Sequence, residues 1–338
     1  MKAVVLEDTG RAAIHEAPEP VREHEHDVLL HVRKVGLCGS DLNSYRGRNP
    51  MVSYPRILGH EVAATVAETN PNAPEWPAGM AVTLSPYSSC GRCAACLRGR
   101  PNACDCNQTL GVQRDGALTE RIVVPASKLF RADLTLKELC LVEPLTVGFH
   151  ATARGRIEAQ DTVAVFGCGG VGLGAVAGAA FRGATVIGID LDDEKLATAR
   201  KAGAAHVINT AHEDLHIRLT ELTDGRGPDV VIEAIGLPQT FRAAVEEVAF
   251  TGRVVYIGYA KEQVAYETRL FVQKELDVLG SRNAQPEDFR NVIRMLEAGR
   301  FPVDDAVTHI VPMDETPAIL AAWSQEPCRF TKIMIDIG

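Results

Sequence analysis

The sequence predicts a two-domain α/β protein, in which an irregular antiparallel β domain is combined with a doubly wound parallel-sheet domain. The first observation is size: 338 residues with 46% hydrophobic content can bury a sizeable core and are more typical of two domains than of one. The second is a change of pattern near residue 160, where short apolar strands begin to alternate with helix-like stretches. The third is the first 150 residues, whose short strands are separated by Gly and Pro turns.

The parallel sheet is predicted from apolar segments that alternate with helices between about residues 160 and 280. One of these helices has Asp192 as its expected N-cap and Gly203 as its expected C-cap. Strands that alternate with helices in this way indicate a doubly wound sheet. The predicted strands are TVAVF at 162–166, TVIGI at 185–189, HVI at 206–208, DVVIE at 229–233, RVVYI at 253–257 and LDVLG at 276–280.

The tail after Arg282 offers a helix, a short strand, a second helix from about Asp314 and a closing strand, FTKIMIDI. It is too short for a core of its own, so we expect it to pack on the N-terminal domain. The predicted domains are therefore 1–150 with 283–338, interrupted by a nucleotide-binding domain at 151–282.

Charge and composition exclude several partners. A net charge of -9 and an isoelectric point near 5.6 give no basic surface for nucleic acid or for an anionic membrane. Glu7 and Asp8 interrupt the N-terminus before a signal peptide could form, which predicts a cytoplasmic protein with mostly reduced cysteines.

One segment imitates a membrane helix, because Thr162 to Phe181 is twenty residues without a charge. Six glycines lie in it, directly after the β-branched run TVAVF. That clustering favours a strand, a tight turn and a buried helix over a membrane span.

A glycine-rich turn predicts a dinucleotide site. Gly167, Gly169 and Gly172 follow a predicted strand and open a helix, a spacing that lets backbone N–H groups approach a pyrophosphate. The next strand ends at Asp190, eighteen residues after the last glycine, where a carboxylate can accept both ribose hydroxyls of adenosine. Such a carboxylate would repel a 2'-phosphate, and no arginine follows within nine positions, so NAD is favoured over NADP. The alternative is a glycine turn in an α/β domain that binds no nucleotide.

Four cysteines on one short loop predict a structural zinc site. Cys90, Cys93, Cys96 and Cys104 have the spacing C-x2-C-x2-C-x7-C, and four thiolates can close around a tetrahedral zinc with no open position. Free thiols or one oxidised pair are the alternatives. Cys106 is a spare thiol or a competitor for Cys104.

A second, dispersed set has the donors of a catalytic zinc. It consists of Cys38, His60, Glu61 and Glu143, separated by 22 residues and then by about 80. Spacing of this size says nothing about proximity. A thiolate, an imidazole and a carboxylate are nevertheless a plausible set that leaves room for substrate.

These motifs together resemble a known family. VGLCGSD, YPRILGHE, the four-cysteine loop, EPLTVGFHA and VFGCGGVG followed by GID have the order and near-intervals of the zinc-dependent medium-chain alcohol and polyol dehydrogenases. The resemblance covers essentially the whole chain. It implies a GroES-like catalytic domain with a structural zinc lobe at about 88–106, an inserted Rossmann domain, NAD, and two zinc ions per chain.

The resemblance also implies roles for individual residues. Cys38, His60 and Glu61 match the catalytic zinc ligands, and Glu143 stands where polyol dehydrogenases, unlike simple alcohol dehydrogenases, have a glutamate near the zinc. The four cysteines match the structural zinc lobe. The expected cofactor-binding residues are Thr146, Gly167, Gly169, Gly170, Val171, Gly172, Asp190, Ile235, Gly236, Ile257, Gly258, Ser281 and Arg282.

In the implied reaction a secondary alcohol becomes a ketone, and its hydride passes to the nicotinamide. Ser40 stands where the family uses a hydroxyl to pass the alcohol proton onward. The family commonly has a histidine five residues after the ligand cysteine, whereas this chain has Asn43, which cannot titrate near pH 7. Asn43 is therefore either a link in a different proton path or a polar turn residue.

Arginines suggest an acidic substrate. Arg46 and Arg48 follow the ligand cysteine, Arg56 precedes His60, and Arg282 leaves the last strand, and any of them could grip a carboxylate or phosphate. Surface ion pairs or contacts to the cofactor are the alternative. We expect oxidation of a polyhydroxy acid, an aldonate, since VSYPRILGHE and GSRNAQPEDF also resemble hexonate 5-dehydrogenases.

Three other functions remain open at this point. They are a neutral polyol dehydrogenase of the sorbitol type, an L-threonine dehydrogenase, and a zinc- and nucleotide-binding protein without turnover. The expected partners are a small polyol or sugar acid and, by family resemblance, further copies of the chain in a tetramer or a dimer.

Overall fold

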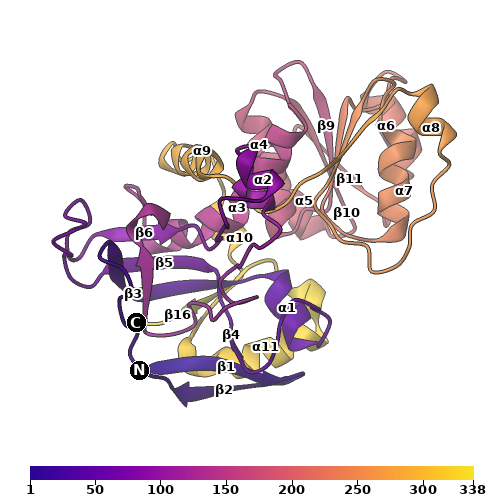
Figure 1. Ribbon diagram of the computed structural model, residues 1–338. Helices are drawn as coiled ribbons and strands as arrows, with labels where there is room; N and C mark the ends of the chain where they lie inside the picture. Colours follow the sequence, from indigo (N-terminus) through magenta and orange to yellow (C-terminus); the bar gives the residue numbers. More distant parts are fainter. The chain divides into compact units, whose positions relative to one another are not determined.

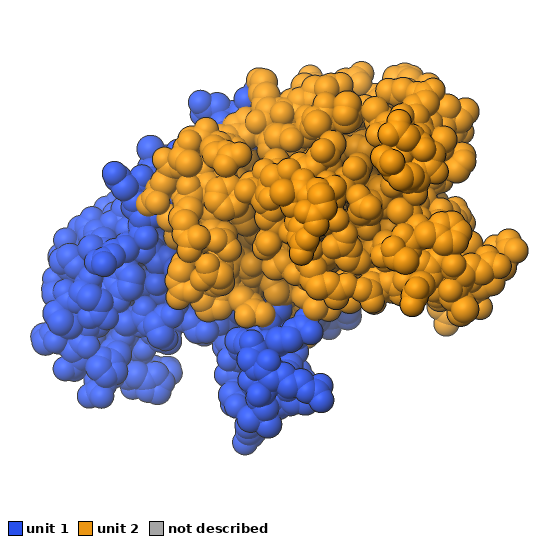
Figure 2. Space-filling model, turned by 90° about the horizontal axis from the view of Figure 1, so that it is seen from above, with its two compact units in different colours: residues 1–143, 303–338 blue, residues 144–302 orange. Residues whose placement is uncertain are grey.

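The computed structural model describes residues 1–338, with the side chain of Cys328 left aside, and divides into two compact units (Figure 2). The first unit comprises residues 1–143 and 303–338, and the second comprises residues 144–302. The inserted unit is therefore longer than the predicted 151–282. It includes a helix, α9 (Pro286–Glu297), that was expected to belong to the tail.

The first unit is built on a seven-stranded sheet of order β15-β16-β3-β5-β6-β8, with β7 also paired to β3. A smaller sheet has the order β2-β1-β4. All pairs are antiparallel except β15 with β16. The strands are β1 (Lys2–Asp8), β2 (Arg11–Glu16), β3 (Asp27–Leu37), β4 (Arg56–Ile57), β5 (Glu61–Val66), β6 (Ala81–Leu84), β7 (Arg121–Pro125), β8 (Leu129–Arg131), β15 (His309–Pro312) and β16 (Ile333–Asp336).

A bulge in β3 explains why the buried positions of this long strand change from even-numbered to odd-numbered residues. Val28, Leu30 and Val32 are buried on one face, and the register then shifts between Val32 and Lys34. The extra residue exchanges the two faces of the strand, so Val35 and Leu37 are again buried. The shifted register also decides which residue of β5 lies opposite Gly36.

The helical segments of the first unit are short. α3 (Leu136–Arg154) begins in this unit and ends in the second. The others are α1 (Gly39–Tyr45), α2 (Ala94–Leu97), α10 (Val303–Ala306), α11 (Thr316–Gln325) and the 3-10 turns η1 (Pro101–Ala103), η2 (Ala126–Lys128), η3 (Met313–Glu315) and η4 (Pro327–Arg329).

The second unit confirms the predicted doubly wound sheet. Its six strands are all parallel, in the order β11-β10-β9-β12-β13-β14, with α4 on one side of the sheet and α6 and α7 on the other (Figure 1). The strands are β9 (Thr162–Phe166), β10 (Thr185–Asp190), β11 (His206–Asn209), β12 (Val230–Glu233), β13 (Arg253–Tyr256) and β14 (Asp277–Gly280). The further helices are α4 (Gly170–Phe181), α5 (Asp193–Lys201), α6 (Leu215–Leu222), α7 (Pro238–Glu247) and α8 (Arg269–Gln273).

This sheet has a topological switch point between β9 and β12, where successive connections go to opposite faces. In sheets of this order, ligands bind beyond the carboxyl ends of the strands at that point. The uncharged segment 162–181 is divided between β9 and α4. No helix among the described residues combines the length and apolar character that a membrane crossing requires.

Candidate metal and cofactor sites

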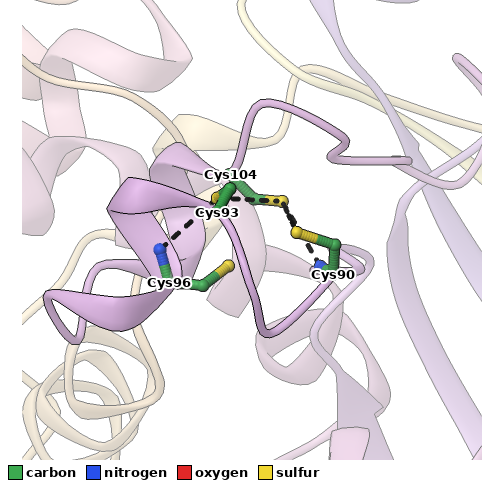
Figure 3. A group of neighbouring side chains, drawn as sticks. All are labelled: Cys90, Cys93, Cys96 and Cys104. Carbon is green, nitrogen blue, oxygen red and sulfur yellow. Dashed lines mark hydrogen bonds between the residues drawn. The ribbon is translucent and has the colours of Figure 1, made fainter.

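The four cysteines of the loop around α2 form a compact thiol cluster. Their sulfur atoms all lie within 4.8 Å of one another, with 3.8 Å between Cys93 and Cys104 and 3.6 Å between Cys104 and Cys90 (Figure 3). Zn–S bonds of about 2.3 Å in a tetrahedron place sulfurs about 3.8 Å apart. The cluster therefore has the size of a four-thiolate zinc site.

Backbone groups prepare these thiols for a cation. The Cys96 N–H donates to the Cys93 sulfur at 3.5 Å, and the Cys90 N–H donates to the Cys104 sulfur at 3.3 Å. The N–H groups of Arg92 and Cys93 lower the pKa of Cys90 to about 6. A thiolate at neutral pH is the form that zinc binds.

Cys106 lies outside the four-thiol cluster. It is exposed, and its sulfur shares a second group of candidate ligand atoms with Asp105 and Cys90, all within 4.8 Å. A hydrogen bond to Asp105 raises the pKa of the Cys106 thiol to about 11. Since Cys104 belongs to the four-thiol cluster, Cys106 remains a spare thiol at its edge.

The dispersed set is brought together by the pairing of β3 with β5. Cys38 follows β3 directly, His60 precedes β5 and Glu61 begins it; one ligand atom from each lies within 4.8 Å of the others. Gly36 lies opposite Glu61, and a Cβ at Gly36 would come within 1.9 Å of the Glu61 carboxylate. Glycine at this position is what allows the carboxylate to lie between the strands.

The His60 imidazole lies between Ser40 and Asp41. Its Nε2 lies 3.5 Å from the Ser40 hydroxyl, and its Nδ1 lies 3.9 Å from Asp41 Oδ1. Both Nδ1 and Oδ1 are buried without a hydrogen-bond partner, while Asp41 Oδ2 accepts from the Cys38 N–H at 2.9 Å. A carboxylate behind the imidazole is the usual support of a metal-binding histidine.

The charges in this region suit a cation. Burial lowers the pKa of His60, but the negative charges of Asp41, Cys38 and Glu143 and a hydrogen bond to Cys38 together outweigh it, and the pKa is raised well above its ordinary value. Burial also raises the pKa of Asp41. Cys38, His60 and Glu61 are the donor types of a catalytic zinc and lie among crowded acids, so these residues fit such an ion.

Lys332, which the sequence analysis did not single out, holds Glu61. Its ammonium donates to both Glu61 oxygens at 2.6 and 2.8 Å and to the Leu37 carbonyl at 3.2 Å, and both side chains are buried. Burial of a carboxylate is costly unless it is paired. The signal in the sequence was one lysine at the start of the apolar run of the closing strand, FTKIMIDI.

Glu143 is held by a second residue that the sequence analysis missed. The buried Tyr87 hydroxyl donates to Glu143 Oε1. Burial raises the pKa of Glu143 to about 7, and the charges of His60 and Glu61 act on it as well. Its carboxylate lies outside the group of ligand atoms formed by Cys38, His60 and Glu61.

Helix α1 places Ser40 and Asn43 almost one turn apart, on neighbouring positions of one face. Ser40 is half-buried beside His60, and the Asn43 carbonyl accepts from the Arg48 N–H at 2.8 Å. Asn43 is half-buried. The turn after α1 thus uses the Asn43 backbone carbonyl.

In the second unit the glycine turn lies at the carboxyl end of β9. Gly167 has a positive φ of 92°, and a Cβ on Gly172 would lie 1.7 Å from the Gly167 carbonyl oxygen. Asp190 ends β10 beside this turn, and its Oδ2 accepts from the Cys168 N–H at 2.8 Å. Gly170, Val171 and Gly172 form the first turn of α4.

The other expected cofactor residues of this unit follow the neighbouring strands. Thr146 is buried in α3. Buried Glu233, which sequence reasoning missed, shapes the turn after β12: its Oε1 accepts from the N–H groups of Ile235 and Gly236 at 3.0 and 2.7 Å. The residues directly beyond the carboxyl ends of β12, β13 and β14 are Ile235, Gly236, Ile257, Gly258, Ser281 and Arg282.

Two of the expected substrate arginines are engaged by the protein itself. Arg46 donates to the Ser324 hydroxyl at 3.1 Å and to the Ser324 carbonyl. Arg56 donates to Asp115 at 2.9 Å and to the Ser53 hydroxyl at 3.0 Å. The pair of Arg56 with Asp115 matches the alternative of a surface ion pair, Arg46 is bound by a serine instead, and Arg48 is exposed.

Comparison with known proteins identifies the family. A model described as alcohol dehydrogenase GroES-like domain matches residues 24–133, and one described as zinc-binding dehydrogenase matches residues 170–298. A sorbitol dehydrogenase of Bacillus subtilis strain 168 is 33% identical over 99% of this chain and 97% of its own. The chain belongs to the zinc-type alcohol dehydrogenases. It is therefore an oxidoreductase, as the resemblance of its motifs predicted.

Other relatives of this dehydrogenase differ in their named substrates. An L-galactonate-5-dehydrogenase of Escherichia coli K12 is 32% identical over 85% of each chain. The solved structure of the alcohol dehydrogenase rspB from E. coli CFT073, complexed with NADH, has a TM-score of 0.90 and 28% identity, and the match covers 100% of this chain and 99% of the other. The dehydrogenase class is thus shared, while substrates vary among relatives.

Proposed function

We propose that this dehydrogenase oxidises a secondary alcohol of a polyhydroxy acid to the ketone, with NAD+ as hydride acceptor. The carbinol carbon loses its hydrogen with the bonding electron pair to the nicotinamide, which becomes NADH, and the hydroxyl proton leaves to solvent. The observation that carries this proposal is the compact group of half-buried Cys38 with buried His60 and Glu61 in a chain of the zinc-binding dehydrogenase family.

The metal sites of the proposal use two sets of ligands. A catalytic zinc would be held by Cys38, His60 and Glu61, with Glu143 nearby, and a structural zinc by the four-cysteine cluster. When bound, the catalytic zinc supplies Lewis acidity toward the alcohol oxygen. Asp41 places a negative charge 3.9 Å behind the His60 imidazole, and Lys332 neutralises Glu61, so that both donors have a charged partner.

Asp190 supports NAD over NADP. Its Oδ1 accepts from the N–H groups of Leu191 and Asp192 at 2.7 and 3.2 Å, and its Oδ2 from Cys168. The carboxylate is therefore fixed at the end of β10, where it can accept ribose hydroxyls and repels a 2'-phosphate.

Ser40 is the proposed first carrier of the alcohol proton, because its hydroxyl lies beside His60. Asn43 cannot titrate, so the proton path beyond Ser40 would run through water or a cofactor hydroxyl. Asn43→His should leave zinc binding intact and change the pH profile of oxidation. An unaltered profile would return Asn43 to the role of a turn residue.

Relatives support more than one substrate. The L-galactonate-5-dehydrogenase favours a sugar acid, whereas the sorbitol dehydrogenase favours the runner-up, a neutral polyol. Rates of NADH formation on a panel of aldonates, neutral polyols and L-threonine would decide between them. Turnover of neutral polyols alone would replace the sugar acid, and two bound zinc ions without any turnover would contradict the dehydrogenase reaction.

The proposal includes a cytoplasmic homo-oligomer, a tetramer or a dimer. β14 ends the parallel sheet and pairs only with β13, so one edge of it is open to a strand from a second copy. Val278 on this strand is 46% exposed, which is unusual for an apolar strand residue. Light scattering after gel filtration would give the mass directly.

A further inference from the structure

Lys128 and Arg114, two positively charged residues of the first unit, lie in loops whose backbones are hydrogen-bonded to residues 85–86, directly after β6. The Ser85 N–H donates to the Lys128 carbonyl at 2.9 Å, and the Leu110 N–H donates to the Pro86 carbonyl at 3.1 Å. The loop that begins at Leu110 closes on Arg114, whose carbonyl accepts from the Gly111 N–H at 2.8 Å. The turns that carry Lys128 and Arg114 are thus both tied to residues 85–86.

No acid compensates this pair among the described residues. Arg114 and Lys128 are both half-buried, and neither forms an ion pair with any described carboxylate. The Arg114 Nε is buried without a hydrogen-bond partner. The adjacent carboxylate, Asp115, is turned to Arg56 at 2.9 Å and to the Ile57 N–H at 3.2 Å.

The two cations also act on each other. Burial, and then the positive charge of Arg114, lower the pKa of Lys128, and burial lowers the pKa of Arg114. Two like charges that are partly removed from water, with no acid between them, are unfavourable unless an anion binds there. The folded chain nevertheless keeps both cations, Arg114 and Lys128, partly buried.

The segment that ties these two turns continues to the proposed catalytic centre. Tyr87 follows residues 85–86 directly, and its hydroxyl donates to Glu143. Backbone pairing of Tyr87 with Thr109 ties the same segment to the loop that leads to Arg114. The two cations therefore lie on short turns that are connected to the residue that holds Glu143, which favours a small molecule over a macromolecule as the occupant.

We propose that Arg114 and Lys128 form an anion-binding site for the acidic group, carboxylate or phosphate, of the polyhydroxy substrate. This inference rests on the proposed function and names the residues that would recognise the acid. Arg114 supplies a planar pair of donors and Lys128 a point charge, a combination suited to an oxyanion. Arg46 and Arg56, expected from the sequence for this task, are engaged elsewhere.

The first test measures binding without turnover. Inorganic phosphate, titrated into the zinc-loaded protein, should raise the melting temperature of the wild type but not that of Arg114→Gln or Lys128→Gln. In anion-free buffer both variants should melt at or above the wild-type temperature, since one of two like charges has gone. Arg11→Gln, which removes an exposed cation of the same unit that pairs with Glu7, is the matched control and should keep the full phosphate effect.

The second test uses kinetics to identify the acid. KM for the preferred anionic substrate should rise about 10-fold or more in Arg114→Gln and Lys128→Gln, with KM for a neutral polyol unchanged. Aldonates and polyol phosphates form separate arms, so the larger KM effect tells carboxylate from phosphate. Arg114→Lys keeps the charge and should recover part of the loss, which separates anion binding from a folding defect.

The outcomes distinguish this inference from the proposed function. A phosphate effect on the melting temperature that persists in both Gln variants, or is missing from the wild type, overturns the anion site. Phosphate binding that depends on Arg114 and Lys128, in a protein that oxidises no secondary alcohol, overturns the proposed reaction and leaves the anion site standing.

Discussion

The two candidate metal sites of the first unit are built in opposite ways. The four cysteines come from one loop of fifteen residues, at positions 90–104, and all supply the same donor. Cys38, His60 and Glu61 come from the adjoining ends of two paired strands, supply three different donors and are surrounded by further acids. A uniform, local set closes around a metal and braces a loop, whereas a mixed set on rigid strands leaves room for chemistry.

The largest expected effect is the loss of catalytic activity when a ligand of the mixed site, rather than one of the four-cysteine cluster, is removed. Cys38→Ala should reduce kcat/KM about 1000-fold or more, since a Lewis-acidic metal contributes several kcal/mol to such a transition state. The fold should survive, as judged by circular dichroism. Equal losses of activity in Cys38→Ala and in a folded, zinc-depleted Cys93→Ala would erase the distinction.

The next effect concerns the buried pair of the mixed site. Lys332→Met should destabilise the zinc-free protein by about 3 kcal/mol, because Glu61 is then left as an uncompensated buried charge. The double variant Glu61→Gln with Lys332→Met should regain most of that loss in urea unfolding. If the single variant is as stable as the wild type, Glu61 has another compensating partner.

The thiol site is expected to act on stability more than on catalysis. Cys93→Ala should remove one zinc ion and lower the free energy of unfolding by about 2 kcal/mol, because metal binding to such a loop contributes to folding. Cys106→Ala is the matched control, and both zinc content and melting temperature should stay at wild-type values. Loss of zinc from the Cys106 variant would make this thiol a ligand.

The smallest expected effect is on the pH dependence of stability and concerns Glu233, a buried acid of the second unit that lies outside both candidate metal sites. Its Oε1 is bound by N–H and hydroxyl groups, and burial raises its pKa. A raised folded-state pKa gives stability that is present below the unfolded value of 4.5 and lost as pH rises through the folded value. Glu233→Gln should therefore gain melting temperature over the wild type at pH 8, and the gain should shrink toward pH 4.5. A difference that does not change with pH would mean that the pKa of Glu233 is the same in the folded and unfolded chain.

Elements with local signals could be predicted from the sequence. The strands of the parallel sheet agree with the predicted ones to within one residue at each end, because apolar runs and glycine turns are local patterns. The four-thiol cluster was evident from spacing alone. The domain boundaries differed, since the second unit also includes α9 and part of α3.

Partners that depend on distant contacts could not be predicted. Lys332 meets Glu61 only because β16 pairs with β3 beside β5, and Tyr87 meets Glu143 across 56 residues. Single polar residues in apolar surroundings give no pattern that names their partner. For the same reason the sequence suggested arginines near the ligand cysteine, whereas the structure leaves a different pair, Arg114 and Lys128, without an acid.

Zinc content measured by mass spectrometry, together with NADH formation from secondary alcohols, tests the central claim most directly. The wild type should hold two zinc ions per chain and turn over. Cys38→Ala and Cys93→Ala should each lose one, and only Cys93→Ala should retain turnover. A wild type with one zinc ion, or a Cys38→Ala variant with two zinc ions and full activity, would contradict the account.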